Sequence, residues 1–185
     1  FSNDFIFHVT ENAEAAAELK RRTDESHSDS RDALARAISR GNLEQVKKLL
    51  GRSARRINDR RPQGGSTPLS TAALHGKLDI AKYLIKRGAK VEATNNDGNT
   101  PLHVAAFLCR SEIVQLLLDK GASPLTKNKR GETPIDVVSS PWTRQLADFY
   151  TGIGRSSGFK LDLKRIERER PQIARQLQKS AAKSK

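Results

Sequence analysis

The chain is poor in several residue types, and each shortage excludes a class of protein. Cys109 is the only cysteine, so no internal disulfide framework can hold the fold together. No apolar run approaches the ~18 residues that a membrane-spanning helix requires. Hydrophobic residues make up 36% and aromatic residues 5% of the 185 positions, which is little for one spherical core. A stack of layers tolerates this composition, because each layer needs only its neighbours.

Methionine is absent, and the chain begins at Phe1. We therefore expect a processed product or a piece of a longer protein. No segment has the composition of a signal peptide. The sequence leaves the compartment open between the cytoplasm and export with an N-terminal signal already removed.

Residues suited to catalysis or metal binding are few and scattered. None of the four histidines lies at metal-ligand spacing from another histidine or from Cys109. They are His8, His27, His75 and His103. No nucleophile–base pair is indicated either. We therefore expect no metal site, no cofactor and no catalytic activity.

The net charge of +13 is unevenly distributed. Residues 1–30 carry seven acidic and three basic side chains, whereas 31–66 and 151–185 each carry ten basic and three acidic ones. The middle of the chain, 67–150, is close to balanced, with eleven basic and eight acidic side chains. Strong basic patches attract nucleic acid, anionic lipid or acidic protein, so the flanks are a candidate surface for such partners.

Short segments recur at a fixed period. Thr67-Pro68-Leu69 returns as Thr100-Pro101-Leu102 and again as Thr133-Pro134-Ile135, 33 residues apart each time. Gly88-Ala89 returns as Gly121-Ala122 at the same spacing. A period of this length indicates one supersecondary unit repeated along the chain, with each unit burying its apolar face against the next.

The repeated unit has the signals of two helices. In residues 98–122, Thr100 suits a helix N-cap and Pro101 suits the first helical position, where its missing N–H is no loss. The small side chains of Ala105-Ala106 allow close approach of neighbouring helices. A denser apolar stripe follows and ends at Gly121, a typical residue after a helix C-terminus.

These segments resemble the ankyrin repeat family, most closely over GNTPLHVAA (98–106) and IVQLLLDKGA (113–122). The resemblance covers about 31–150 and implies an all-α solenoid of helix-turn-helix repeats with β-turn tips. We expect about four repeats there, the first and last atypical. A helical N-terminal extension and linker precede them over 1–30, and a basic helical extension follows over 151–185.

In that family, partners usually bind the concave face made by the loop tips and the first helices. The resemblance therefore implies a binding surface at Arg60, Arg61, Leu74, Asn96, Asp97, Asn99, Phe107, Leu108, Lys127, Lys129 and Arg130. It also implies that His103 hydrogen-bonds between repeats. The alternative is that the tips are ordinary solvated loops. We expect Phe107 or Leu108 to be exposed as an apolar anchor, because such anchors are typical hot spots.

The C-terminal part is expected to close the stack. We predict a helix over 142–150, a flexible loop over 152–158 and a helix capped by Asp162, with Pro171 starting a further helical turn. The loop contains Gly152-x-Gly154, but it lacks the Lys-Ser/Thr ending of a phosphate-binding loop. The apolar residues of this part should cover the open end of the last repeat, with Trp142, Leu146, Phe149, Leu163, Ile166, Ile173 and Leu177 buried there.

The favoured function is a monomeric, non-catalytic scaffold that binds a protein partner, an acidic one among the options, through its concave face. One alternative is binding of nucleic acid or an anionic surface through the basic flanks. Another is a regulatory or targeting domain of a larger enzyme. The identity of the partner is not encoded in the repeats, because such stacks bind many unrelated targets.

Overall fold

A computed structural model describes residues 31–51, 54–157 and 160–183. The expected N-terminal extension over 1–30 lies outside these residues. Within them the chain is helical, with no strand. The elements are a helix over 31–40, α2 (Leu43–Leu50), the 3-10 helix η1 (Ala54–Asn58), α3 (Pro68–Leu74), α4 (Leu78–Lys86), α5 (Pro101–Phe107), α6 (Ser111–Asp119), α7 (Asp136–Ser139), α8 (Arg144–Ser157) and α9 (Leu163–Lys183).

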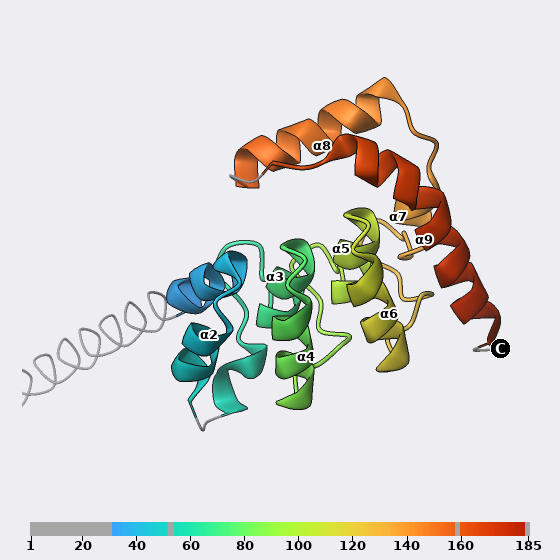
Figure 1. The fold of residues 1–185 in the computed structure, drawn as a ribbon. Helices are drawn as coiled ribbons and strands as arrows, with labels where there is room; N and C mark the ends of the chain where they lie inside the picture. Colours follow the sequence, from blue (N-terminus) through green and yellow to red (C-terminus); the bar gives the residue numbers. More distant parts are fainter. Residues whose placement is uncertain (1–30, 52–53, 158–159, 184–185) are drawn as a thin grey trace, which may run out of the picture.

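The helices pair and stack side by side, as Figure 1 shows. Each pair consists of a first and a second helix, and α3 with α4 and α5 with α6 are the most regular pairs. First helices contact first helices and second helices contact second helices along the stack. The predicted all-α repeat solenoid is therefore confirmed.

Local sequence explains where the first helices begin. The hydroxyl oxygen of Thr67 accepts from the backbone N–H of Ser70 at 3.2 Å, and that of Thr100 accepts from His103 N–H at 3.4 Å. Both threonines precede a proline at the first helical position. The paired alanines of α3 and α5 are fully buried, so the first helices pack closely at these positions.

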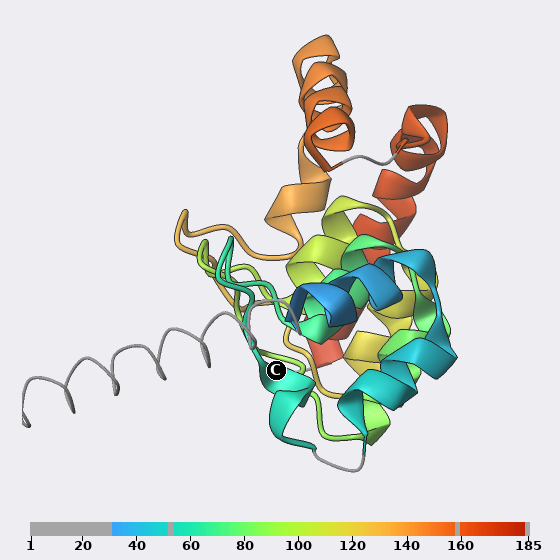
Figure 2. The same cartoon turned by 90° about the vertical axis from the view of Figure 1, so that its left-hand side faces the viewer.

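The loop tips project together from one side of the stack (Figure 2). Neighbouring tips are joined by backbone hydrogen bonds, from Asn96 N–H to the Gly64 carbonyl at 3.0 Å and from Lys129 N–H to the Asp97 carbonyl at 2.9 Å. Gly98 has a φ of +79°, and a Cβ there would lie 2.8 Å from the Lys129 nitrogen. Glycine is therefore required where one tip rests on the next.

The fourth repeat is completed by a distant part of the chain. Its first helix, α7, has only four residues, and α9 packs against α7, α6 and α5. The Arg165 guanidinium donates to the Cys109 carbonyl at 2.8 Å, and the Gln176 amide donates to Gln115 at 2.7 Å. Arg165 thus contacts a residue just before α6, and Gln176, further along α9, contacts the middle of α6. α9 therefore runs alongside α6 in the same direction and occupies the place of the missing second helix.

The C-terminal helices differ from expectation in two places. Residues 152–157, predicted as a flexible loop, continue α8, and Pro171 lies inside α9 rather than at the start of a helix. Packing outweighs the local signals in both cases. The buried side chain of Tyr150 anchors α8. In α9, Ile166 and Ile173 are buried before and after Pro171, and the proline itself is exposed. The expected domain boundary at 150/151 therefore falls inside one helix.

Only some of the residues predicted to cover the open end of the stack are buried there. Ile166, Ile173 and Leu177 are fully buried in α9, whereas Phe149 is 54% exposed and does not cover the end of the stack. Trp142, Leu146 and Leu163 are partly buried against the core.

We predict that Ile173→Ala lowers the free energy of unfolding by about 2–5 kcal/mol, because it leaves a cavity between α9 and the last complete repeat. Urea unfolding followed by circular dichroism measures the change. Arg175→Ala, two residues along the same helix and exposed, is the matched control and should stay within about 0.5 kcal/mol of the parent chain. Equal effects of the two substitutions would contradict a capping role for α9.

Candidate functional site

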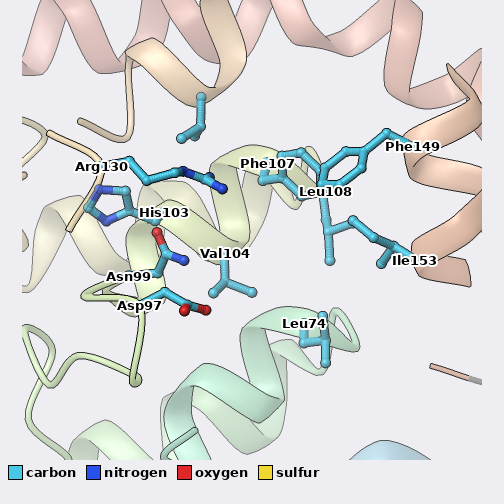
Figure 3. Close-up of a pocket in the computed structure, with 11 residues that line it drawn as sticks. Leu74, Asp97, Asn99, His103, Val104, Phe107, Leu108, Arg130, Phe149 and Ile153 are labelled. Carbon is cyan, nitrogen blue, oxygen red and sulfur yellow. The ribbon is translucent and has the colours of Figure 1, made fainter. Parts of the chain in front are cut away.

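The concave side carries a half-open recess of about 270 Å³ between the first helices and α8 (Figure 3). One wall is apolar and is formed by Leu74, Val104, Phe107, Phe149 and Ile153. The other side is polar and is formed by Asp97, Asn99, His103 and Arg130. Val137 and Leu108 complete the lining. We call this set of residues the recess.

Phe107 lies at the centre of the apolar wall. Its ring stacks on Tyr150 with a centroid distance of 4.4 Å, and it meets Phe149 edge-on at 6.1 Å. Phe107 remains partly exposed. Of the two candidate anchors, Phe107 is therefore the exposed one, whereas Leu108 is 1% exposed and belongs to the core.

The predicted surface residues fall into two groups. Leu74, Asp97, Asn99, Phe107, Leu108 and Arg130 line the recess. The remaining residues lie on the tips outside it, and they are Arg60, Arg61, Asn96, Lys127 and Lys129.

Three of these outer residues have structural partners. The Arg60 guanidinium donates to the Gly65 carbonyl at 3.1 Å and to the Asn96 side chain at 3.0 Å. Arg61 forms a salt bridge with Asp32 at 3.0 Å. These contacts hold the first tip against its neighbours, so only part of the predicted surface is free to bind.

The third tip fixes Arg130 beside the recess. The Asn128 side-chain oxygen accepts from the backbone N–H groups of Arg130 at 2.9 Å and Glu132 at 3.0 Å. The Arg130 Nε donates to the Glu132 carboxylate at 2.8 Å. Hydrogen bonds from Asn128 and Arg130 lower the pKa of Glu132, so this carboxylate stays charged and holds the arginine in place.

His103 connects two repeats, as the resemblance implied. Its Nδ1 lies 3.1 Å from the Thr100 backbone nitrogen, and its Nε2 lies 3.0 Å from the Glu132 carbonyl oxygen. The neutral ring fits both contacts when Nδ1 accepts and Nε2–H donates. Burial lowers the pKa of His103, partly offset by its hydrogen bond to Glu132 and by nearby carboxylates. His103 is therefore a structural residue at the edge of the recess.

We predict that the free energy of unfolding falls as the pH is lowered through about 6.5, the ordinary value for histidine. Burial lowers the pKa of both His103 and His75, with Lys77, Arg110 and Arg61 adding to the effect at His75. The unfolded chain therefore takes up protons before the folded chain does, and stability is lost on acidification.

Urea titrations at about pH 7 and pH 5 test this linkage. His103→Gln should be less stable than the parent at pH 7 but should lose less between the two values. Glu132 and Asp136, whose pKa values are also lowered, titrate in a more acidic window. A parent chain that is equally stable at both pH values would contradict the assignment.

Cys109 is a buried structural residue. It stands in the place that Gly76 has in the preceding repeat, and it shares the positive φ, at +51° against +65°. Burial raises the pKa of its thiol to about 11, against the opposing effect of Arg170 and Arg165. Its sulfur donates to the Ile166 carbonyl at 3.7 Å, so it is held under α9. Little thiolate is present near neutral pH, and no nucleophile is offered to the surface.

We predict that Cys109 does not react with a thiol reagent such as dithiobis-nitrobenzoate at pH 8 while the chain is folded. Reaction should occur at the rate at which α9 undocks or the chain unfolds, because burial blocks access. Absorbance at increasing urea concentrations gives both rates. Rapid labelling in buffer without urea would show that the thiol is accessible.

The sequence did not indicate that α8 would reach the recess. Its two contributing residues, Phe149 and Ile153, are one helical turn apart, which is a helix signal. Gly152 and Gly154 instead favoured a loop. The spacing of Phe149 and Ile153 was the only available sign that both would face one side of a helix.

The described part of the chain contains no group of three or more His, Cys, Asp or Glu residues that could hold a metal ion. Across the same residues, no helix has the length and apolar character needed to span a membrane.

Comparison with known proteins gives the same repeat assignment. A profile of the family described as "Ankyrin repeats (3 copies)" matches residues 11–128, more than half of the chain. Human protein phosphatase 1 regulatory subunit 27 is 46% identical over 65 residues, which are 35% of this chain and 41% of that protein. Its mouse counterpart is 42% identical over 74 residues, covering 40% and 47%.

A second human relative, protein fem-1 homolog A, is 44% identical over 69 residues, 35% of this chain and 10% of that protein. The chain spans less than half the length of each of these relatives. The likeness therefore concerns the repeats and not the whole proteins.

Proposed function

Because this chain belongs to the ankyrin repeat family, we propose that it is a non-catalytic module that binds a protein partner on its concave face. The observation that carries this proposal is the recess, where an apolar wall around Phe107 stays partly exposed beside the basic third tip, which carries Lys127, Lys129 and Arg130. Apolar anchors surrounded by polar groups are the usual composition of protein-binding hot spots.

The open shape of the recess suits a protein partner. Its volume of about 270 Å³ is close to the lower end of the range of about 300–1,000 Å³ that is typical of sites for drug-sized ligands. The recess is open along one side. This volume suits a side chain that enters from a partner's surface.

The rigidity of the tips supports the same function. Backbone hydrogen bonds join each tip to the next, and asparagine side chains close the turns from inside. A surface that is already ordered loses little conformational entropy on binding. The tips therefore present Lys127, Lys129 and Arg130 in fixed positions.

The relatives suggest one class of partner. Two of them are named as regulatory subunits of protein phosphatase 1. By analogy, a phosphatase is a candidate partner for this chain. We propose that the binding unit is a monomer that includes α8 and α9, since α9 packs on α5, α6 and α7 and α8 contacts Phe107 of α5 through Tyr150 and Phe149.

A second candidate function follows from the outer face of α9. Lys164, Arg168, Arg175, Lys179 and Lys183 are exposed there, opposite the buried side of the helix. A basic stripe of this kind can bind nucleic acid or another anionic surface. We favour the concave face because the described part of α9 carries no exposed aromatic residue that could stack on bases.

We predict that replacing Lys127, Lys129 and Arg130 together by glutamine slows association with an acidic protein partner by about tenfold at low salt. The reason is that exposed charges at the rim of a site steer encounter. A partner purified from the source cells and rebound to the isolated chain in biolayer interferometry supplies the measurement. The matched control replaces Lys164, Arg168 and Arg175 on α9 and should leave the rate unchanged.

The same two variants test the alternative with duplex DNA. If α9 is the binding surface, affinity should fall with salt at a log–log slope near ~0.9 per phosphate neutralised. Loss of binding in the α9 variant, with the tip variant unaffected, would overturn the proposed function.

A further inference from the structure

The recess has a wall that the repeats do not provide. The complete repeats pass from first helix to second helix through a short turn, but α8 is inserted between α7 and α9. Figure 3 shows Phe149 and Ile153 of this helix pointing toward Phe107 and the open space beside it. A helix in this position can be a displaceable lid or a permanent wall.

The contacts of Tyr150 make α8 a permanent wall. Tyr150 is 0% exposed, and its hydroxyl donates to the Phe107 carbonyl at 2.6 Å. The same oxygen accepts from Arg170 at 2.8 Å. The Tyr150 ring also stacks with Phe107 at a centroid distance of 4.4 Å and with Trp142 at 5.6 Å. Undocking α8 would break all of these contacts together.

Arg170 adds to the cost of displacement. It is 3% exposed, and it also donates to the Ser140 carbonyl at 3.0 Å and lies over the Tyr150 ring at 6.0 Å. The Tyr150 hydroxyl is the acceptor that α8 supplies, so undocking α8 would remove one partner of this buried guanidinium. These contacts favour a docked α8 when a partner arrives.

Phe149 is presented to solvent by this fixed helix. Among the described residues, the large apolar side chains that are classed as exposed are Phe149, at 54%, and Leu125, at 46%. Leu125 lies outside the recess. Across the recess from Phe149, Val104 and Leu74 are only partly buried. An apolar side chain placed between these residues would remove apolar surface from water on both sides.

Arg130 gives this apolar gap a charged edge. Its Nε is held by Glu132, while no described residue accepts from its terminal nitrogens Nη1 and Nη2. Figure 3 shows the guanidinium extending over the recess toward Phe107. Those two nitrogens fit the oxygens of a carboxylate. With Lys127 and Lys129, this tip carries three cations, which outnumber the two carboxylates at or beside the recess, Asp97 and Glu132, so an acidic ligand is favoured over a basic one.

We propose that the recess between α5 and α8 binds a short linear segment of a protein partner that combines an apolar side chain with a neighbouring Asp or Glu. The apolar side chain enters between Phe149 and Val104, and the carboxylate pairs with Arg130. This inference rests on the proposed function and narrows it. The segment must contact α8, so a stack of repeats alone would not recognise it.

The test uses a displayed library of random linear peptides, selected on the whole chain, with enriched peptides then synthesised and titrated by fluorescence anisotropy. We expect the selected peptides to share an aromatic or aliphatic residue beside Asp or Glu. Phe149→Ala should weaken their binding by roughly tenfold, as for a hot-spot contact. Leu125→Ala, at the other exposed apolar residue, is the matched control and should change binding less than twofold.

A second pair of variants tests the charged edge. Arg130→Gln should remove the preference for peptides with Asp or Glu over their Asn or Gln counterparts. Lys129→Gln, the neighbouring exposed cation outside the recess, should preserve it. A preference that survives Arg130→Gln would overturn the role of this arginine.

Val104→Asp separates this inference from the proposed function, because it changes the concave face without touching α8. Circular dichroism of each variant confirms that its fold is retained. Loss of binding in both Val104→Asp and Phe149→Ala supports the two proposals together. Loss in Val104→Asp alone would leave the concave face as the site and overturn the role of α8. Tighter binding in Phe149→Ala would show that α8 is a lid, and unchanged binding in both would overturn both proposals.

Discussion

The structure depends on how the carbonyl end of each first helix is covered by the next layer. The Lys77 side chain lies over Gly41, and the Arg110 guanidinium donates to the Leu74 carbonyl at 3.4 Å. The last regular layer has no such residue, because Thr143 stands one period after Arg110. Arg165 of α9 takes over and donates to the carbonyls of Leu108 and Cys109, at 3.2 and 2.8 Å. Each cation also meets the negative end of a helix dipole.

This requirement explains why the recess exists in its present form. A second helix that supplies Arg165 must start beside the end of α5, and the chain reaches that point only after passing through α8. Tyr150 then satisfies the Phe107 carbonyl, the next free acceptor at the same helix end. The residues that close the stack thus also hold α8 in place as the wall of the recess. The shape of the recess therefore depends on a correctly folded fourth repeat.

The periodic part of the fold could be predicted from the sequence because its determinants are local. The Thr-Pro pairs, the paired alanines and the terminal glycines act within one repeat and recur in phase. The course of α8 and α9 could not, since Gly152 and Pro171 favour breaks that tertiary packing overrides. The surroundings of Leu108 have the same origin. Nothing near it in sequence indicates that Arg165 of α9, 57 residues later, donates to its carbonyl.

The place of α9 in the fourth repeat has a consequence for how the protein is made. In a simple repeat array each layer can form as soon as its own residues leave the ribosome, because contacts are local. Here the Cys109 carbonyl can accept its hydrogen bond only after Arg165, 56 residues later, has been synthesised. Contacts between residues far apart in sequence form late, because the chain loses the entropy of loop closure before the contact contributes any stability. The first three layers can therefore stack on the nascent chain, while the recess is completed only after synthesis has passed Leu177.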